Sequence, residues 1–430
     1  MTLNMRQVGI SLLYVAIMSW IYLTEIVSHW SYMGFRGTFT ASGLAVSVVI
    51  TVATSAMLSQ TRDTRAATLA CMHYLFFLPA IILLAYSSAP AEHYVAFLIV
   101  WGSLTFFSAL QFKPPIITTL EPKNILIIVF GAILFALISQ AAYGGMATFN
   151  LDIERVYEFR REAASNLPTI FGYVYSNVAS VLVPLALVLS YKFRAYWLMA
   201  IAFACSVMLF GMTHHKSVLF TPPAVALLYI LFLRMRSPHM IGIVFLVIPL
   251  LCATELIYLR LFVDSSDSGY INSLLARRVL FVPSLLDSLY INYFNDNGKY
   301  FWSASHIFSW AIDNPFGVSA PFLIGSEYFY DNDMSANAGV IGSGYSNAGL
   351  LGVAVYAAAS GALLALLNAH GRRIGHALVT GVSLTTTFNI LTTTDLLTAI
   401  LTHGLLLLLA LLAVFPAPGV RRPAPARRVA

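Results

Sequence analysis

The sequence has few charged residues. Asp, Glu, Lys and Arg make up 10% of its 430 residues, whereas hydrophobic residues make up 59% and the mean hydropathy is +0.80. A soluble domain carries roughly 25% charged residues, so this deficit excludes an ordinary water-facing surface. The apolar runs are continuous rather than alternating, which favours membrane-spanning α-helices over a β-barrel. We therefore expect an all-α polytopic membrane protein.

Residues that could form a metal site or a disulfide framework are also few. The three cysteines, Cys71, Cys205 and Cys252, all lie in apolar runs and are interpreted as small core residues. Asp331 and Asp333 form an Asp-x-Asp pair, but the sequence around them is typical of a solvated turn. The sequence has no P-loop, no GxGxxG after a strand and no HExxH. It therefore predicts neither a metal site nor a cofactor, and no segment resembles a soluble nucleotide-binding domain.

The apolar runs predict about twelve membrane spans. Pro222 and Pro223 predict that the short eighth span is kinked or partly re-entrant. The expected spans lie near residues 8–28, 38–58, 67–87, 94–112, 124–142, 168–190, 195–213, 217–233, 240–260, 345–368, 374–391 and 396–415.

The basic residues predict the orientation of these spans. With the N-terminus in the cytoplasm, fifteen of the 24 basic residues fall in cytoplasmic segments, as the positive-inside rule requires. Only Asp63 and Glu121 of the 18 acidic residues do so. Arg6 is followed by an apolar stretch without a small-residue cleavage site, so we expect an uncleaved first span. The net charge of +6 does not indicate nucleic-acid binding, since the basic residues stand in pairs at the ends of apolar runs. Both termini are therefore predicted to be cytoplasmic.

This layout predicts one transmembrane domain over residues 1–415, followed by a basic cytoplasmic tail over 416–430. Two outer loops, 144–168 and 261–345, are long, and long loops in a compact design usually carry function. Within the larger loop, residues 282–293 predict an amphipathic helix in the membrane interface. Its expected apolar face is Val282, Leu285, Leu286, Leu289 and Tyr293, its expected polar face is Ser284, Ser288 and Asn292, and Ser346 or Asn347 is expected to cap the next span.

Basic residues in outer segments oppose the positive-inside rule and therefore need another explanation. Anion binding is the obvious one. Arg277 and Arg278 precede the expected amphipathic helix, at the height where a lipid-linked diphosphate would lie. Pairing with nearby aspartates or with lipid headgroups is the alternative. Nine basic residues belong to this outer group: Arg36, Arg155, Arg160, Arg161, Lys216, Arg260, Arg277, Arg278 and Lys299.

Two further cationic groups are candidates for binding the diphosphate. Arg160 and Arg161 lie in the first long loop, where a salt-bridged surface helix is the alternative interpretation. His215 and Lys216 follow the seventh span, where Lys216 is otherwise expected to snorkel.

The large loop adds a candidate base and several rings. His306, between two tryptophans, is a candidate general base for deprotonating a sugar hydroxyl. Tyr290, Tyr293 and Trp302 are candidates for stacking on sugars. A structural histidine and an interfacial aromatic belt are the alternatives.

The layout of spans, the long outer loop and the arginines in two outer loops resemble the O-antigen polymerase (Wzy-type) family. Arg161 and Gly172 resemble the family's Arg-x10-Gly pattern, and RRVLFVPSLLDSLYINYF (277–294) resembles the segment around its essential arginine. No glycine follows Arg277 or Arg278 at that spacing, so the choice between them stays open. THHKSVLF (213–220) and YSNAGLLG (345–352) are also similar to segments of polysaccharide polymerases.

The resemblance implies a metal-independent membrane glycosyltransferase in the bacterial inner membrane, with its active site facing the periplasm. Its substrate would be an undecaprenyl-diphosphate-linked oligosaccharide, polymerised into O-antigen or a related surface polysaccharide. Membrane lipid and a chain-length regulator would be its partners. Two alternatives stay open: an O-antigen ligase, and a flippase or other transporter, for which Glu255 and Asp395 are the candidate intramembrane charges.

Overall fold

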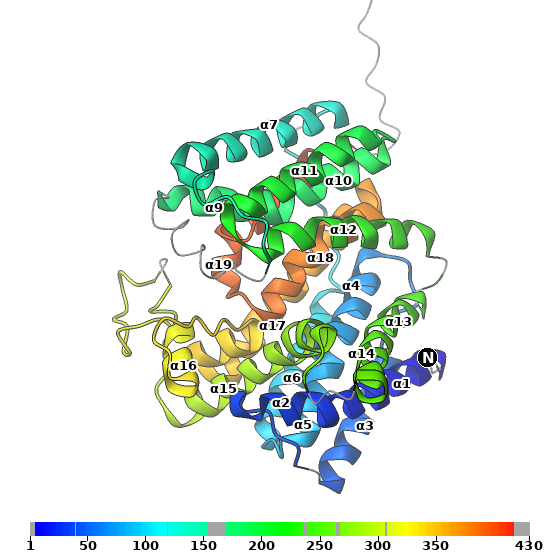
Figure 1. The fold of residues 1–430 in the computed structure, drawn as a ribbon, viewed down its shortest axis with the longest axis vertical. Coiled ribbons are helices and arrows are strands. Elements are labelled where there is room, and N and C mark those ends of the chain that lie inside the picture. Colours follow the sequence, from blue (N-terminus) through cyan, green and yellow to red (C-terminus); the bar gives the residue numbers. More distant parts are fainter. Residues whose placement is uncertain are drawn as a thin grey trace, which may run out of the picture. The chain divides into compact units, whose positions relative to one another are not determined.

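The computed structural model describes residues 5–38, 40–117, 119–153, 168–235, 237, 239–263, 267–305 and 308–416. Within these ranges the regular elements are helices, and no strand is present (Figure 1). The fold class expected from composition is thus confirmed at the level of an all-helical protein. The chain groups into two compact units, one of Met1–Leu110, Arg234–Ala365 and Thr386–Ala399, the other of Gln111–Leu233, Leu366–Thr385 and Ile400–Ala430.

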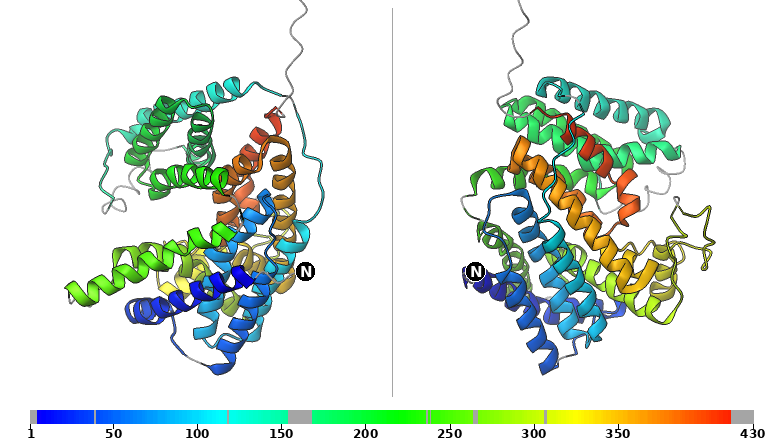
Figure 2. Two further views of the ribbon diagram at one scale, coloured as in Figure 1. Left: turned by 90° about the vertical axis from the view of Figure 1, so that its right-hand side faces the viewer. Right: turned by 180° about the vertical axis from the view of Figure 1, so that it is seen from behind.

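The first unit begins with one long helix in four parts, α1 (Met5–Ile21), η1 (Tyr22–Ile26), α2 (Val27–Trp30) and η2 (Ser31–Met33). This helix packs against α3 and α14, and Figure 2 shows α1 beside α14. The other helices of the unit, wholly or in large part, are α3 (Ala41–Ala56), α4 (Thr64–Met72), η3 (His73–Phe77), α5 (Leu78–Tyr86), α6 (Ala91–Phe107), α13 (His239–Phe245), α14 (Val247–Tyr258), η6 (Leu259–Val263), η7 (Asn272–Phe281), α15 (Val282–Asp296), α16 (Ala320–Phe329), α17 (Val340–Ile374) and α19 (Leu396–Leu401).

The second unit is also helical. Its elements are α7 (Pro122–Gln140), η4 (Ala141–Gly145), α9 (Thr169–Asn177), η5 (Val178–Leu182), α10 (Val183–Lys192), α11 (Tyr196–Thr213), α12 (Lys216–Arg234), most of α18 (His376–Thr392) and α20 (Leu405–Val414). Helix α10 packs against α11 and α7.

Eight helices of the described chain are long and apolar enough to cross a membrane: Met5–Met33, Thr64–Tyr86, Pro122–Gly145, Ile170–Lys192, Tyr196–Thr213, Lys216–Arg234, His239–Val263 and Val340–Ile374. Three shorter apolar helices are Ala41–Ala56, Ala91–Phe107 and Leu405–Val414. Helices overlap every expected span, but two details differ from the sequence-based prediction. The last span is divided into α19 and α20, with Gly404 in the left-handed region at φ 81° between them. Helix α12 continues through Pro222 and Pro223.

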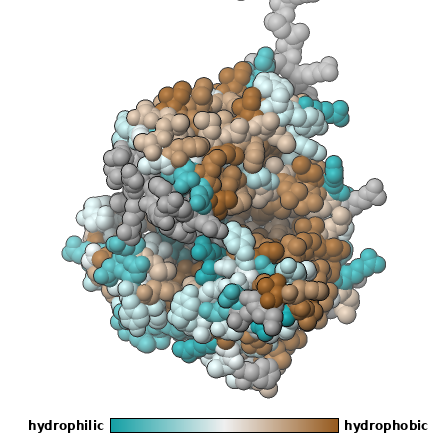
Figure 3. Space-filling view, viewed as in Figure 1, coloured by the Kyte–Doolittle hydropathy of each residue, from teal (hydrophilic) through white to brown (hydrophobic). Residues whose placement is uncertain are grey.

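Helix α7 shows why these helices suit lipid. One of its sides is buried through Ile125, Val129 and Ile133, while the other exposes large apolar side chains. A helix that is apolar all round belongs in a membrane or in a large core, and apolar residues cover much of the face seen in Figure 3. The exposed residues are Ile127, Ile128, Leu134, Phe135 and Ile138.

Helix α15 corrects the prediction of an interfacial amphipathic helix. The helix is present, but Ser284 and Ser288 of its expected polar face are buried along with Leu285, and of that face Asn292 alone is exposed. Asp287 on the same helix is also fully enclosed. The Asp287 carboxylate accepts a hydrogen bond from the backbone N–H of Gly342, 2.9 Å away. The helix is therefore a core element of the first unit.

The expected caps at Ser346 and Asn347 are also corrected. Helix α17 begins earlier, at Val340, and is broken at Ala348 and Gly349, where the backbone leaves helical geometry. The side chains of Ser346 and Asn347 bond back to the carbonyl oxygen of Ser343, at 3.0 and 2.8 Å. Ser346 and Asn347 therefore lie at the end of the first part of α17, before the break, and do not cap the start of a span.

Candidate functional site

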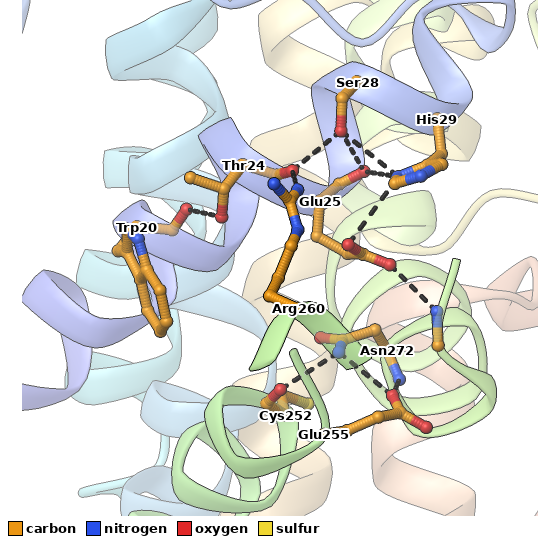
Figure 4. Close-up of polar contacts among 10 residues, drawn as sticks. Trp20, Thr24, Glu25, Ser28, His29, Cys252, Glu255, Arg260 and Asn272 are labelled. Carbon is orange, nitrogen blue, oxygen red and sulfur yellow. Dashed lines mark hydrogen bonds and ion pairs between the residues drawn. The ribbon is translucent and has the colours of Figure 1, made fainter. Parts of the chain in front are cut away.

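A buried polar contact in the first unit joins the first helix to the segment just before η7. Glu25 lies on the π-helical turn η1 and is 1% exposed. One of its carboxylate oxygens accepts a hydrogen bond from the backbone N–H of Gly269 at 3.0 Å, and the other lies 3.7 Å from Nδ1 of His29. Arg260 is a further cationic neighbour (Figure 4). The buried carboxyl group of Glu25 thus has a backbone N–H donor and a nearby guanidinium, and His29 adds positive charge only when its imidazole is protonated.

Glu255 on α14 holds the same segment from a second side. Its two oxygens accept hydrogen bonds from the backbone N–H groups of Ile271 and Asn272, both at 2.7 Å. The Asn272 side chain adds a bond to Glu255 at 3.0 Å and another to the carbonyl oxygen of Cys252. The first N–H groups of a helix have no partner within it, so Glu255 caps the helix that carries η7.

Arg277 lies five residues after Asn272 on this helix and is held by the end of the first helix. Its guanidinium stacks over the indole of Trp30, 4.7 Å from the ring centroid. It donates to Oγ of Ser273 at 2.7 Å and lies 3.8 Å from the sulfur of Met33. Arg277 is half-buried, whereas its neighbour Arg278 is exposed.

The spacing of these contacts shows how the two helices run. Glu25 meets Gly269, and Met33 meets Arg277, so the offset along the chain is the same on both partners. Because the two contacts follow in the same order along both segments, the segments lie side by side in the same direction. The contacts at Glu25, Glu255 and Trp30, which we call the η7 clamp, therefore fix the position of Arg277.

This arrangement is suited to binding an anion. A guanidinium held by stacking loses little side-chain freedom when it binds, and its planar fork matches phosphate oxygens. Arg278 adds a second cation on the exposed side of the same turn. The sequence analysis singled out both arginines, and it interpreted Glu255 as a candidate intramembrane charge of a transporter, but it placed neither Glu25 nor Glu255 with the arginines. The missed signal was Glu25, which also lies in an apolar run, where an ionisable residue is costly.

His215 and Lys216, the candidate cationic pair of the second unit, lie where α11 ends and α12 begins. His214 follows α11 in the left-handed region at φ 56° and is buried, and burial lowers the pKa of its imidazole. His215 is exposed and Lys216, the first residue of α12, is half-buried. His214 and His215 therefore occupy the break between two helices rather than one helix.

The three candidate sugar-binding rings differ in exposure. Tyr290 is 1% exposed and donates its hydroxyl to the carbonyl oxygen of Ala336 at 2.9 Å, so the structure assigns it a packing role and leaves no ring face for a sugar. Tyr293 is half-buried and packs edge-on against Phe294. Trp302 is half-buried and stacks with Tyr356, with ring centroids 6.4 Å apart.

Three candidate residues, Arg160, Arg161 and His306, lie outside the described residues. Among the residues that the structure describes, no group of three or more His, Cys, Asp or Glu side chains is placed to hold a metal ion. The Asp331–Asp333 pair forms a local turn in which the backbone N–H of Asp333 donates to the Asp331 carboxylate at 2.9 Å.

No family model matches the chain, and no curated protein or solved structure matches it either.

Proposed function

We propose that this protein is a metal-independent membrane glycosyltransferase that polymerises undecaprenyl-diphosphate-linked oligosaccharides into a surface polysaccharide. It would have about twelve spans, cytoplasmic termini and an active site on the periplasmic face of the bacterial inner membrane. The observation that supports this proposal best is the placement of Arg277, stacked on Trp30 and bonded to Ser273, beside the exposed Arg278.

In this proposal the two arginines bind the diphosphate of the lipid carrier. During transfer, the bond between the sugar and the diphosphate breaks and negative charge develops on the departing phosphate oxygen. Preorganised cations near that oxygen lower the barrier because they need little rearrangement as the charge forms. The acceptor hydroxyl loses its proton to a base, for which His306 is a sequence-based candidate, and its oxygen forms a new glycosidic bond to the anomeric carbon. The lipid carrier leaves as its diphosphate.

The test is polymer formation by purified protein in nanodiscs, supplied with lipid-linked repeat units and no energy source. Arg277→Ala should reduce polymer at least about a hundredfold, the size seen when one donor to a developing anion is removed. Arg277→Lys should recover little of this loss, because lysine keeps the charge but loses the planar fork. Arg36→Ala removes an arginine near the end of the first helix that is not part of the η7 clamp, and should leave polymer unchanged. Full polymer from an Arg277→Ala, Arg278→Ala double variant would refute the proposal.

The lipopolysaccharide of cells that lack this protein separates the polymerase proposal from the ligase alternative. Loss of a polymerase leaves lipopolysaccharide core bearing a single repeat, whereas loss of a ligase leaves core with none while polymer accumulates on its carrier. The ligase alternative is based on His306, which lies 28 residues after Arg278 in the sequence and outside the described residues.

Transport is the second candidate function, and Glu25 is the observation that favours it. A carboxylate that is 1% exposed within an apolar helix is typical of ion and substrate pathways. A transporter would move the lipid-linked oligosaccharide across vesicle membranes without lengthening it. Translocation without polymer in sealed vesicles would therefore replace the proposed function with this one.

A further inference from the structure

A short loop in the first unit docks onto the break in helix α17. The backbone N–H groups of Tyr300 and Phe301 donate to the carbonyl oxygens of Ser346 and Asn347, at 2.9 and 3.0 Å. The N–H of Trp302 donates to Oδ1 of Asn347 at 2.8 Å. We call residues 299–303 together with 345–349 the loop–helix junction.

The junction holds a strained backbone. Phe301 and Trp302 both have left-handed φ angles, 48° and 64°, in a region that residues with a Cβ rarely adopt. Gly349, at φ 60°, provides the matching bend on α17. Backbone strain of this kind persists only where the surroundings enforce it, and it concentrates at ligand-binding positions. Here three hydrogen bonds enforce it, and their effect is to fix the direction of the Trp302 side chain.

The Trp302 ring is the start of a polar chain. Its indole N–H donates to the hydroxyl of Tyr356 at 3.1 Å, and that hydroxyl donates to the Asp395 carboxylate at 2.8 Å. Asp395 is fixed in turn by the backbone N–H of Thr398 at 3.0 Å. Trp302 and Asp395 are both partly exposed, whereas Tyr356 is buried. The ring face and the carboxylate are thus held rigidly in relation to each other by an internal hydroxyl.

Further polar groups occupy the other end of the junction. The Lys299 ammonium lies 4.9 Å from the ring centroid of Tyr345, and the Tyr345 hydroxyl donates to Glu92 and lies 3.2 Å from Oδ1 of Asn295. Glu92 and Asp296 are negative neighbours of Lys299, whose pKa is lowered by burial. With Asp395, carboxylates outnumber cations here, so the junction disfavours a negatively charged ligand.

We infer that the loop–helix junction is a binding subsite for an uncharged oligosaccharide, with Trp302 stacking on a sugar ring and Asp395 accepting hydrogen bonds from its hydroxyls. The weakly polar C–H face of a pyranose fits an indole, and its hydroxyls need fixed acceptors around that face, as specific small-molecule sites provide. The inference rests on the proposed function for the identity of the sugar, and it assigns the glycan part of the substrate to residues apart from Arg277 and Arg278.

The test is direct binding without the lipid diphosphate. The probe is the repeat oligosaccharide, released by mild acid from the lipid-linked intermediate of the same cells and titrated calorimetrically into the full-length protein in nanodiscs. Trp302→Ala should weaken binding about tenfold or more, and Asp395→Asn should weaken it severalfold, while Trp302→Phe, which keeps a ring, should stay within about threefold. Trp310→Ala removes an 84% exposed tryptophan of the same loop and should bind like the parent protein.

Several outcomes would overturn the inference. They are no binding of the probe to the parent protein, equal binding by Trp302→Ala and Trp310→Ala, or tighter binding of a galacturonic acid pentasaccharide than of a galactose pentasaccharide, its neutral counterpart. Because Trp302→Ala could also weaken the fold, its unfolding midpoint is measured beside that of Trp302→Phe and Tyr356→Phe. Probe binding by protein that forms no polymer would count against the proposed function and leave the subsite standing, so the two failures are distinguishable.

Discussion

The guanidinium of Arg277 lies over the indole of Trp30, with 4.7 Å between its central carbon and the ring centroid. Trp30 is 6% exposed, so the stacked pair is largely removed from water, where an interaction between a cation and a ring is strongest. The first helix thus supplies the surface on which an arginine from far along the chain is oriented.

Trp30→Ala should therefore reduce polymer formation without removing either arginine. A partly desolvated cation–π contact contributes about 0.5–2 kcal/mol, so we expect a reduction of roughly twofold to thirtyfold, with partial recovery in Trp30→Phe. Trp20→Ala, which removes a 41% exposed tryptophan of the same helix, is the matched control. Equal activity in Trp30→Ala and Trp20→Ala would show that the stacking does not position Arg277.

Gly269→Ala should disrupt the η7 clamp. A Cβ at this position would lie 2.1 Å from a Glu255 carboxylate oxygen and 2.4 Å from its carboxyl carbon. Glu255 would have to move away from the N–H groups of Ile271 and Asn272, and each buried donor left without a partner costs about 1–3 kcal/mol.

The measurement is the thermal unfolding midpoint in detergent, together with polymer yield, and both should fall. Gly298→Ala is the control, because the nearest atom to its Cβ would be 3.8 Å away, in Phe316. An unchanged midpoint in Gly269→Ala would mean that the clamp contributes little to the fold.

The sequence predicts the long apolar helices well because each is a local property of about 20 consecutive residues. It could not predict the η7 clamp, since Glu25 and Gly269 are separated by 244 positions. Burial of α15 was missed for the same reason: the partner of Asp287 is the N–H of Gly342, supplied by a different helix. The pattern of apolar and polar residues along one helix does not reveal partners that arrive from elsewhere.

The choice between Arg277 and Arg278 shows the same limit. The two residues are adjacent in the sequence and have the same side chain, so a sequence motif cannot distinguish them. In the structure, Arg277 is half-buried on Trp30 and bonded to Ser273, whereas Arg278 is exposed. In the proposed reaction, the geometry therefore favours Arg277 over Arg278 as the residue that binds the diphosphate. The resemblance to a polymerase family had left both arginines as candidates.

The carboxyl group of Asp287 predicts a pH dependence of stability. Asp287 is fully buried, and burial raises its pKa well above the ordinary value of 3.8, while the N–H of Gly342 opposes the shift. Above about pH 4 the folded state therefore keeps a proton that the unfolded state has lost. The free energy of unfolding should fall as pH rises from about 4 toward the folded-state pKa, by at most about 1.4 kcal/mol per pH unit, and level off above it.

Asp287→Asn should flatten this dependence, because the amide keeps an acceptor for Gly342 but has no proton to lose. Unfolding midpoints at pH 5 and pH 8 measure the effect, and the difference between them should shrink in the variant. Asp313→Asn, which changes an exposed aspartate of the same unit, should keep the difference of the parent protein. If Asp287→Asn keeps the full pH dependence of stability that the parent protein shows, another group causes that dependence.

Single-cysteine labelling tests the orientation on which a periplasmic active site depends. Ser309 is exposed in the segment between α15 and α16, and Ser237 lies between α12 and α13. Because Cys71 and Cys252 are buried and Cys205 is partly exposed, all three are first replaced by alanine. Because basic loops are retained in the cytoplasm, we expect position 309 to face the periplasm and position 237 to face the cytoplasm. A membrane-impermeant maleimide should then modify Ser309→Cys in intact spheroplasts.

Ser237→Cys should react only after permeabilisation, and that reaction shows that the introduced cysteine is itself reactive. Labelling of position 237 in intact spheroplasts, with position 309 protected, would place η7, Arg277 and Arg278 on the cytoplasmic side and remove the periplasmic reaction from consideration.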